Sequence, residues 1–394
     1  MIHKPYVLFT RISLIKNKNG HLFCDPLWEK DLKLHLEYLE NFGICCPVEY
    51  SENIEGLKDI TDLDIKWVFE LKKDYGIKSV FLNLFPNLFT VKNACKNAKI
   101  VHSGGAGWAF PLSFYLLFLR SFFSFRWIIV IESTFWRIEQ GDKKTIRRII
   151  EHYTHKVLLT RCVRIADARI FTQSYYRKYF LGNKEERTLI NPATWIDRDM
   201  ISTSKMVRDR FKERNENTLK IIFPSRLVED KGVFIVLDAI EKLKETKQCI
   251  HLTIMGAGDL EHDCQYFSNA YRGNVDVVFK DPVPYGREFF EILTHYDFVL
   301  VPTLKQEQPR IIFDAFSQGV SVIGSDTSGI RDITNTDNAF TFRRGDSSSL
   351  AEVISSITRS NAVLEMGLKG LDYIAGKTHW QMHKDREEFL NRIL

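Results

Sequence analysis

The second half of the chain alternates short apolar runs with helical patterns, and this alternation constrains the fold more than any other feature. The runs, which we predict to be strands, lie at 219–224, 250–255, 275–279, 298–301, 320–324 and 339–342. They are apolar almost throughout, as strands covered on both faces of a sheet should be. Between the first two runs, apolar residues recur at helical spacing over 233–243, which predicts an amphipathic crossover helix. Because parallel strands require crossovers, the sequence predicts a doubly wound α/β sheet.

The first half repeats this alternation less regularly. Its predicted strands lie at 6–10, 44–48, 80–84, 99–102, 127–131, 168–172 and 188–191, and they indicate a second Rossmann-like unit. A chain of 394 residues is long enough for two such domains, at roughly 150 residues each. We expect ligand sites at the carboxyl ends of the strands and a deep cleft between the two domains.

The domain boundaries follow from a shift in composition. A polar stretch at 203–217 precedes the first strand of the second half and is typical of a helix followed by a linker. We therefore expect an N-terminal domain over 1–200, a linker over 201–217 and a C-terminal domain over 218–376. The final segment, 377–394, has apolar residues among charges. It predicts an amphipathic helix that packs on one of the domains, the N-terminal domain being one option.

The composition excludes several classes of protein. With 44% apolar and 27% charged residues, the chain is that of a globular protein. The net charge of +5 is too small a bias to indicate nucleic-acid binding by itself. The seven cysteines form no Cys-x-x-Cys pair and no zinc spacing, and the first residues lack the pattern of a signal peptide. We therefore expect a cytoplasmic protein that binds no nucleic acid.

Two segments of the first half raise the question of membrane contact. The aromatic segment 110–125 contains an uncharged run that ends at Arg120, which is too short to cross a bilayer. Between 141 and 170 there are eight Lys and Arg residues and three Asp and Glu. Together the two segments would dock the chain on an anionic leaflet, as a peripheral protein of the inner membrane face. The alternative is that the aromatic residues form a core helix and the charges a solvated helix face.

Two motifs directly follow strands of the second half. Arg226 and Lys231 lie in Pro-Ser-Arg-Leu-Val-Glu-Asp-Lys-Gly at 224–232, and they would direct two cations to one point beside a helix N-terminus, where an anion binds readily. The alternative is that they are solvated loop charges. The second motif, Gly256 and Gly258 after the next strand, lacks the third glycine of a dinucleotide fingerprint and is typical of a tight turn.

A third motif lies at 301–319, where a strand and a polar loop precede a helix that Pro309 opens and Gly319 ends. Asp314 stands among apolar neighbours in this helix. A carboxylate in such a place either caps a buried polar network or faces a ligand hydroxyl.

Together these motifs resemble the GT-B nucleotide-sugar transferases of glycosyltransferase family 4, which are retaining enzymes common in polysaccharide assembly. The resemblance is carried by 225–232, 256–258, 306–316 and the Ser-Gly-Ile-Arg-Asp at 328–332, in that order and spacing. It implies two Rossmann-like domains that face each other across a cleft, the N-terminal one for the acceptor and the C-terminal one for the donor. It also implies a hexosyltransferase that moves a sugar from a nucleoside diphosphate to a glycan or lipid-linked acceptor. The donor would be a co-substrate, with no cofactor and no metal required.

By this resemblance, Arg226 and Lys231 hold the donor diphosphate and neutralise the departing nucleotide. The Glu-x7-Glu signature of the family falls on Gln306 and Asp314, which both depart from it. Asp314 would accept hydrogen bonds from the ribose, and the adjacent Glu307 would supply the charge that Gln306 lacks. The backbone N–H groups of 327–330 would lie near the phosphates, with a plain turn as the alternative. The predicted catalytic residues are Arg226, Lys231, Gln306 and Glu307. The predicted donor-binding residues are Arg226, Lys231, Gly256, Gly258, Asp314, Thr327, Ser328, Gly329 and Ile330.

The predicted acceptor-side residues follow two strands of the first half. Gly104 and Gly105 permit close approach of a ligand, and the preceding His102 would bond a sugar or a phosphate. Glu132 and Arg137 follow the next strand and would face the same cleft. The alternatives are a structural histidine and an ordinary start of a loop.

Other functions remain open at this point. A nucleotide-sugar epimerase or hydrolase would consume the donor without a glycosyl acceptor. A catalytically inactive nucleotide-sugar-binding paralogue is the non-enzymatic alternative, because Gln306 and Asp314 depart from the family signature. A nicotinamide oxidoreductase is disfavoured, since the glycine turn lacks the rest of its fingerprint.

Overall fold

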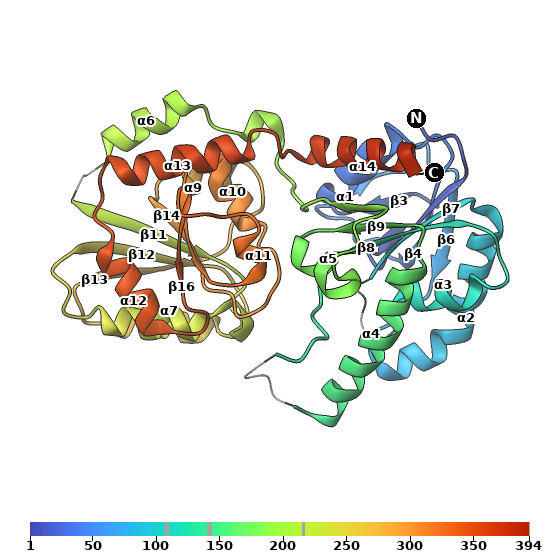
Figure 1. Cartoon of the computed structure of the whole chain (residues 1–394), viewed down its shortest axis with the longest axis horizontal. Coiled ribbons are helices and arrows are strands. Elements are labelled where there is room, and N and C mark those ends of the chain that lie inside the picture. The colour runs from blue at the N-terminus through green and yellow to red at the C-terminus, as the bar shows by residue number, and fades with distance from the viewer. Residues whose placement is uncertain (106, 108–109, 140–143, 215–216, 394) are drawn as a thin grey trace. The chain divides into compact units, whose positions relative to one another are not determined.

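The computed structural model describes all residues except 106, 108–109, 140–143, 215–216 and 394. Ala106 of the glycine cluster and Lys143 of the basic stretch therefore lie outside the described residues. The chain divides into two compact units (Figure 1). Unit 1 consists of Met1–Pro192 and Met382–Leu394, and unit 2 is Ala193–Gln381.

Unit 1 is built on one large, mostly parallel sheet. Within the described residues its strands follow the order β10-β9-β8-β7-β1-β4-β2-β3-β5, and β6 also pairs with β4. The strands are β1 (Tyr6–Phe9), β2 (Leu14–Lys16), β3 (Leu22–Cys24), β4 (Phe42–Tyr50), β5 (Lys58–Asp59), β6 (Trp67–Leu71), β7 (Ile100–Gly104), β8 (Arg126–Ile131), β9 (Ala168–Phe171) and β10 (Thr188–Ile190).

Helices cover both faces of this sheet. They are α1 (Pro26–Leu36), α2 (Ile77–Asn97), α3 (Leu112–Leu119), α4 (Ile146–Ile165), α5 (Ser174–Leu181) and the end of α14 (His379–Ile393). Side chains of α2 to α5 pack in the core of one face, and those of α1 and α14 in the core of the other. Along β8, Trp127, Ile129 and Ile131 belong to the first core, whereas Ile128 and Val130 belong to the second. The strand is therefore apolar at every position because alternate side chains enter different cores.

The strand predicted at 80–84 is wrong, because these residues lie in α2. The helix begins where the Ser79 hydroxyl accepts hydrogen bonds from the N–H groups of Tyr75 and Gly76, at 2.8 and 2.9 Å. Further along, Val91 and Cys95 are buried one helical turn apart. The strand that pairs with β4 at this edge is β6, which the sequence did not predict.

The aromatic segment 110–125 lies mostly in the core. Six of the eight residues of α3 are buried, among them Phe114, Tyr115 and Leu116, while Phe118 and Phe122 are exposed. None of the described helices is both long and apolar enough to span a membrane.

Unit 2 has a fully parallel sheet, with the order β13-β12-β11-β14-β15-β16 among the described residues. The strands are β11 (Thr218–Pro224), β12 (Cys249–Met255), β13 (Val275–Lys280), β14 (Phe298–Val301), β15 (Ser321–Ser325) and β16 (Ala339–Phe342). All six strands predicted for the second half are therefore confirmed. In sequence order this is the doubly wound arrangement, in which the first and fourth strands are neighbours.

Helices flank this sheet as crossovers. They are α6 (Ser204–Glu213), α7 (Val233–Lys242), α8 (Glu261–Ala270), α9 (Arg287–Leu293), α10 (Ile311–Ser317), α11 (Ser328–Arg331), α12 (Ser347–Ser356) and α13 (Asn361–Ile374), with short 3-10 turns η1 (Arg198–Met200) and η2 (Glu229–Lys231). The predicted crossover between the first two strands is α7, whose Val233, Val236 and Ile240 enter the core. The helix predicted within 203–217 is α6, which packs with Val207 against the main chain at Gly319.

Candidate active site

The sheet order of unit 2 creates a crevice at the carboxyl ends of β11 and β14. The two strands are neighbours, but the chain continues from β11 to β12 on one side and from β14 to β15 on the other. The connections therefore diverge at this point, which is where open α/β sheets bind ligands. The loop after β11 carries Arg226 and Lys231, and the loop after β14 carries Gln306 and Glu307.

The glycine turn after β12 supports the loop after β11. The N–H of Leu227 donates to the carbonyl of Ala257 at 2.9 Å, and the N–H of Leu260 donates to the carbonyl of Leu227 at 2.9 Å. A Cβ at Gly256 would lie 1.8 Å from the Ser225 carbonyl oxygen, and one at Gly258 would lie 2.6 Å from that of Leu227. Both glycines also have φ near +150°. The two loops approach so closely that only glycine fits at positions 256 and 258.

A second close contact joins the loops after β11 and β14. Gly232 has φ +82°, and a Cβ there would lie 2.1 Å from the Pro302 carbonyl oxygen. The N–H of Leu304 donates to the carbonyl of Asp230 at 2.9 Å. Between these contacts, the Lys231 ammonium forms an ion pair with the Glu307 carboxylate. Both side chains are partly buried, so the pair is not on an open surface.

Gln306 fixes the start of α11. Its side-chain oxygen accepts hydrogen bonds from the N–H and the hydroxyl of Ser328, both at 2.8 Å. A Cβ at Gly329 would lie 1.9 Å from the Glu307 carbonyl oxygen, so only glycine lets the loop close on this turn. The hydroxyl oxygen of the buried Thr327 has no hydrogen-bond partner among the described residues. The structure thus brings residues 306–307 and 327–329 together beside Lys231.

Arg226 is exposed and makes no ion pair within the described part of the chain. It lies two residues beyond the end of β11. Its guanidinium is therefore available to an anionic ligand, in contrast to the Lys231 ammonium, which a carboxylate already holds.

Asp314 lies in the first turn of α10 and is buried. Tyr285, directly before α9, donates its hydroxyl to one Asp314 carboxylate oxygen at 3.0 Å. Burial raises the pKa of Asp314 to about 7, while the Tyr285 hydrogen bond and the charge of Arg310 lower it. Sequence reasoning did not identify Tyr285, because nothing in its local pattern relates it to Asp314, which lies 29 residues further on.

The acceptor-side predictions fall in unit 1, at the carboxyl ends of β7 and β8. Gly104 pairs with Val130 in register, so it lies beside the end of β8 that leads to Glu132. A Cβ at Gly105 would lie 2.2 Å from the Ile131 side chain, which shows that packing alone requires glycine there. Glu132 is exposed and has no ion-pair partner among the described residues.

His102 and Arg137 both make internal contacts. The Nδ1 of His102 is 2.7 Å from the Tyr6 hydroxyl, and the ring is buried. Burial lowers the pKa of His102 well below its usual range, which favours a structural role. The Arg137 guanidinium lies 5.4 and 5.1 Å from the ring centres of Tyr175 and Tyr179. Their predicted roles toward an acceptor stay predictions.

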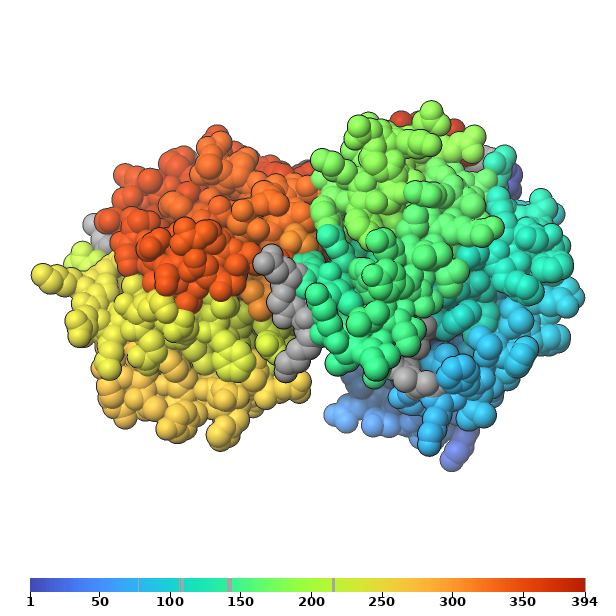
Figure 2. Space-filling view, turned by 60° about the horizontal axis from the view of Figure 1, so that its bottom comes forward, coloured from blue at the N-terminus to red at the C-terminus, as the bar shows by residue number. Residues whose placement is uncertain are grey.

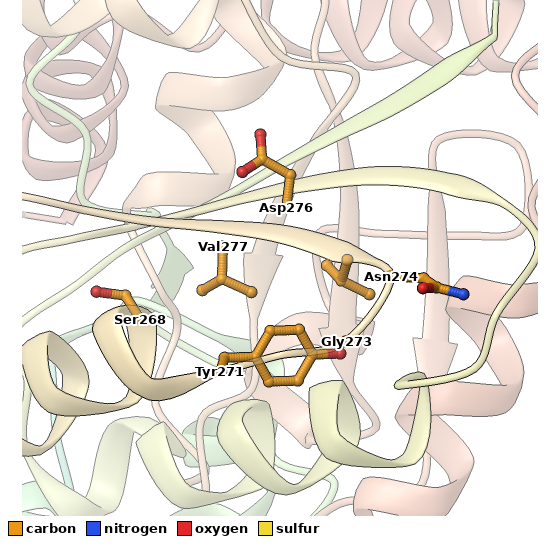
Figure 3. Close-up of a pocket in the computed structure, with 7 residues that line it drawn as sticks. Ser268, Tyr271, Gly273, Asn274, Asp276 and Val277 are labelled. Atoms are coloured by element: carbon orange, nitrogen blue, oxygen red, sulfur yellow. The ribbon is translucent and has the colours of Figure 1, made fainter.

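A shallow pocket of about 360 Å³ lies elsewhere, beside the edge strand β13 (Figure 3). It borders Val275–Val277, which pair with the first residues of β12, so it lies at the amino end of the sheet, opposite the crevice. Its polar side chains have partners: Tyr271 donates to the carbonyl of Ile240 at 3.1 Å, and Asp276 lies 2.6 Å from His251. These two side chains are therefore engaged within unit 2, and none of the predicted site residues lines this pocket.

The donor set of the crevice suits an anion. It contains two cations and the Thr327 hydroxyl, which has no partner among the described residues, and Glu307 is the carboxylate that pairs with Lys231. Residues 218–360 match the family model described as "Glycosyl transferases group 1". These residues are a group 1 glycosyl transferase domain. The crevice at β11 and β14 belongs to this domain, as do all residues predicted to bind the donor.

One curated relative resembles part of the chain. The amylovoran biosynthesis glycosyltransferase AmsK of Erwinia amylovora is 26% identical over 165 residues, which are 39% of this chain. The chain matches 39% of the length of that relative.

Solved structures resemble the whole chain. HepE of Anabaena, in complex with UDP and glucose, matches with a TM-score of 0.65 at 14% identity. The match covers 99% of this chain and 100% of the HepE chain. Sucrose-phosphate synthase of Thermosynechococcus elongatus matches with a TM-score of 0.68 at 13% identity. The match covers 99% of this chain and 98% of the synthase chain. At these identities the likeness establishes the fold alone, and it confirms the predicted GT-B class.

Proposed function

We propose that the chain is a retaining glycosyltransferase that moves a sugar from a nucleoside diphosphate to a glycan or lipid-linked acceptor in polysaccharide biosynthesis. The observation that carries the proposal is the pair of cations on one loop of the group 1 domain, at the switch point of the sheet. One of them, Arg226, has no ion-pair partner among the described residues, and the other, Lys231, is paired with Glu307. The UDP complex of the structurally similar HepE and the amylovoran glycosyltransferase support it.

In the proposed reaction, the two cations stabilise the charge that develops on the departing diphosphate. Such preorganised charge contributes several kcal/mol to transition-state stabilisation. Lys231 must exchange Glu307 for a phosphate oxygen, or share its donors between the two. Glu307 would then stay beside the sugar, where its negative charge favours positive charge that develops at the anomeric carbon.

The remaining residues of the crevice would position the donor. Asp314 would accept a hydrogen bond from a ribose hydroxyl, and Tyr285 would hold its carboxylate in place. Gln306 would act by fixing Ser328, so that the N–H groups of Gly329 and Ile330 in α11 meet the phosphates. In unit 1, Gly104, Gly105, Glu132, His102 and Arg137 remain the proposed acceptor-side residues.

The proposed location is the cytoplasm, at the inner face of the membrane. All seven cysteines are free and six of them are buried, which fits a reducing compartment. A lipid-linked acceptor would place the substrate at this face.

A donor assay tests the proposal. The protein is first titrated with UDP, with GDP and with their sugar conjugates by calorimetry, to find the nucleotide. The donor is then incubated with and without a glycan acceptor fraction. Consumption that depends on the acceptor supports transfer. Consumption without an acceptor identifies an epimerase or a hydrolase, binding without turnover identifies an inactive paralogue, and the absence of nucleotide binding contradicts the proposal.

A further inference from the structure

One face of unit 1 exposes an unusual amount of apolar surface. More than half of the large apolar side chains that are exposed among the described residues lie between 77 and 165, which is less than a quarter of the chain. Single exposed apolar residues need no explanation, but a concentration of them indicates contact with another surface.

The first part of this surface is a stripe on α2. Phe81, Phe85 and Phe89 follow one another at intervals of one helical turn, and their side chains are 71, 75 and 63% exposed. Leu82 extends the stripe and is 77% exposed. The core of unit 1 receives a different side of the same helix, through Val91 and its neighbours. The stripe is thus a second apolar side, which the fold of unit 1 leaves uncovered.

The second part is a stripe on α4. Ile146, Ile150, Tyr153 and Val157 recur at intervals of three and four residues, so they lie on one side of the helix. Each of these side chains is at least 60% exposed. The core instead takes a different side of α4, with Leu159 and its neighbours.

The two stripes lie on the same face of unit 1. The helix α3 contacts both α2 and α4, and it adds the exposed Phe118 together with Phe122 just beyond its end, whose ring centres are 5.4 Å apart. Figure 2 shows this face, with α4 in green and α2 in light blue at the surface. The α2–α4 face consists of Phe81, Leu82, Phe85, Phe89, Phe118, Phe122, Ile146, Ile150, Tyr153 and Val157.

Positive charge surrounds this apolar surface. Helix α2 contains three lysines and no acidic residue. Over 77–165 the chain has fourteen Lys and Arg and four Asp and Glu, an excess larger than the net charge of the whole protein. Among these cations, Arg147, Lys156 and Arg161 are exposed on α4 itself.

We propose that the α2–α4 face docks the protein on an anionic lipid bilayer, with its apolar side chains in the boundary between headgroups and acyl chains. Aromatic and aliphatic side chains flanked by Lys and Arg are the composition of helices that lie in this boundary. A second copy of the chain fits less well, because a symmetric contact would bring two faces of the same positive charge together. The docking deepens the location given under the proposed function by naming the surface responsible, and it does not depend on which sugar or acceptor is used.

Flotation with vesicles tests the apolar part of the proposal. The full chain is mixed with neutral phosphatidylcholine vesicles, and with vesicles that contain about 30% phosphatidylglycerol, at low salt. We expect it to float with the anionic vesicles. The combined substitution Phe81→Ser, Phe85→Ser, Phe89→Ser, Ile150→Ser, Tyr153→Ser and Val157→Ser should lower the bound fraction at least tenfold. The matched control Phe234→Ser with Tyr266→Ser, which changes two exposed aromatic residues of unit 2, should float like the wild type.

A second arm tests the charge. Lys144→Gln, Arg147→Gln and Lys156→Gln together should lower vesicle binding at least tenfold, and added salt should lower it as well. Lys205→Gln, Lys244→Gln and Lys247→Gln, which neutralise exposed lysines of unit 2, should leave it unchanged. The melting temperature and the calorimetric binding of the nucleotide verify that each variant is folded, and they keep this test separate from that of the proposed function.

Two results would overturn the docking. One is a wild-type protein that stays in solution with anionic vesicles at low salt, or apolar variants that still float with them. The other is a wild-type dimer in sedimentation that the apolar substitutions convert to a monomer without any change in vesicle binding, which would identify a second copy as the occupant.

Discussion

Lys231 and Glu307 illustrate what single residues contribute to the crevice. The two residues come from loops that follow β11 and β14, and their ion pair exists only because the sheet makes these strands neighbours. The local patterns around 226–231 and 306–314 predicted that these residues follow strands, and the structure has them after β11 and β14. Their pairing, and the hydrogen bond from Tyr285 to Asp314, could not be predicted, because both depend on contacts between distant segments.

The first prediction concerns the cations. Arg226→Ala and Lys231→Ala should each lower kcat/KM by at least about 100-fold, the scale expected when one charged partner of the transition state is removed. Lys242→Ala is the matched control, because Lys242 pairs with Asp238 on α7 in the same unit, and it should change the rate less than about twofold. Steady-state kinetics with the preferred donor measure kcat/KM of each variant. Wild-type values in both variants would mean that Arg226 and Lys231 are solvated loop charges with no part in the reaction.

The second prediction follows from the pKa of Asp314, which burial raises to about 7. Below that pH the carboxyl is protonated and loses part of its capacity to accept ribose hydrogen bonds, so donor affinity should fall as the pH drops from 8 to 6. Tyr285→Phe removes a hydrogen bond that lowers this pKa, and it should therefore shift the midpoint to higher pH.

A nucleotide sugar is the right probe for this titration, because its phosphates stay ionised throughout the range. Asp314→Asn should abolish the pH dependence and weaken binding, whereas Asp314→Glu should keep both. If Asp314→Asn lowers only the melting temperature, Asp314 is a structural group.

At the scale of elements, the strands of unit 2 were predictable and those of unit 1 only in part. Parallel strands that are buried on both faces can be recognised in a sequence because they are apolar at nearly every position. The same signal gave a wrong strand at 80–84, because a short apolar run fits a strand and a helix equally well. Pro86 lies within α2, and a proline at that place argues against a helix when only the sequence is considered. The strands β2, β3 and β5 were missed because they have only two or three residues each.

The third prediction concerns the contact between the loops after β11 and β12. Gly256→Ala should lower the free energy of unfolding by several kcal/mol, because the new Cβ meets the Ser225 carbonyl and the backbone cannot easily move. Gly286→Ala is the matched control, with nearly the same φ, +158° against +153°, and open space around the Cβ. It should cost about 1 kcal/mol, from backbone strain alone. Urea denaturation of the three proteins measures both values, and equal costs would mean that the two loops can separate.

At the scale of the whole molecule, the proposed chemistry needs no divalent metal. Arg226 and Lys231 would present two cations to the departing diphosphate, and these would supply the charge that Mg²⁺ supplies in enzymes that transfer phosphate groups. The fourth prediction is therefore that EDTA leaves the transfer rate within about twofold of the untreated enzyme. The assay is run on protein dialysed against chelator, with Mg²⁺ and Mn²⁺ added back in parallel. Loss of activity that either ion restores would contradict the assignment of Arg226 and Lys231.

The discontinuity of unit 1 has a consequence for how the protein is made. The core on the α1 side of its sheet contains Phe389 and Leu390 of α14. The rest of unit 1 ends at Pro192. A ribosome that adds about 5–20 residues per second needs roughly 10–40 s to travel from Pro192 to Met382. During this time the nascent unit 1 is already outside the exit tunnel but lacks the helix that closes its core. Unit 1 therefore begins first, but its core can be completed only after the whole of unit 2 has been synthesised.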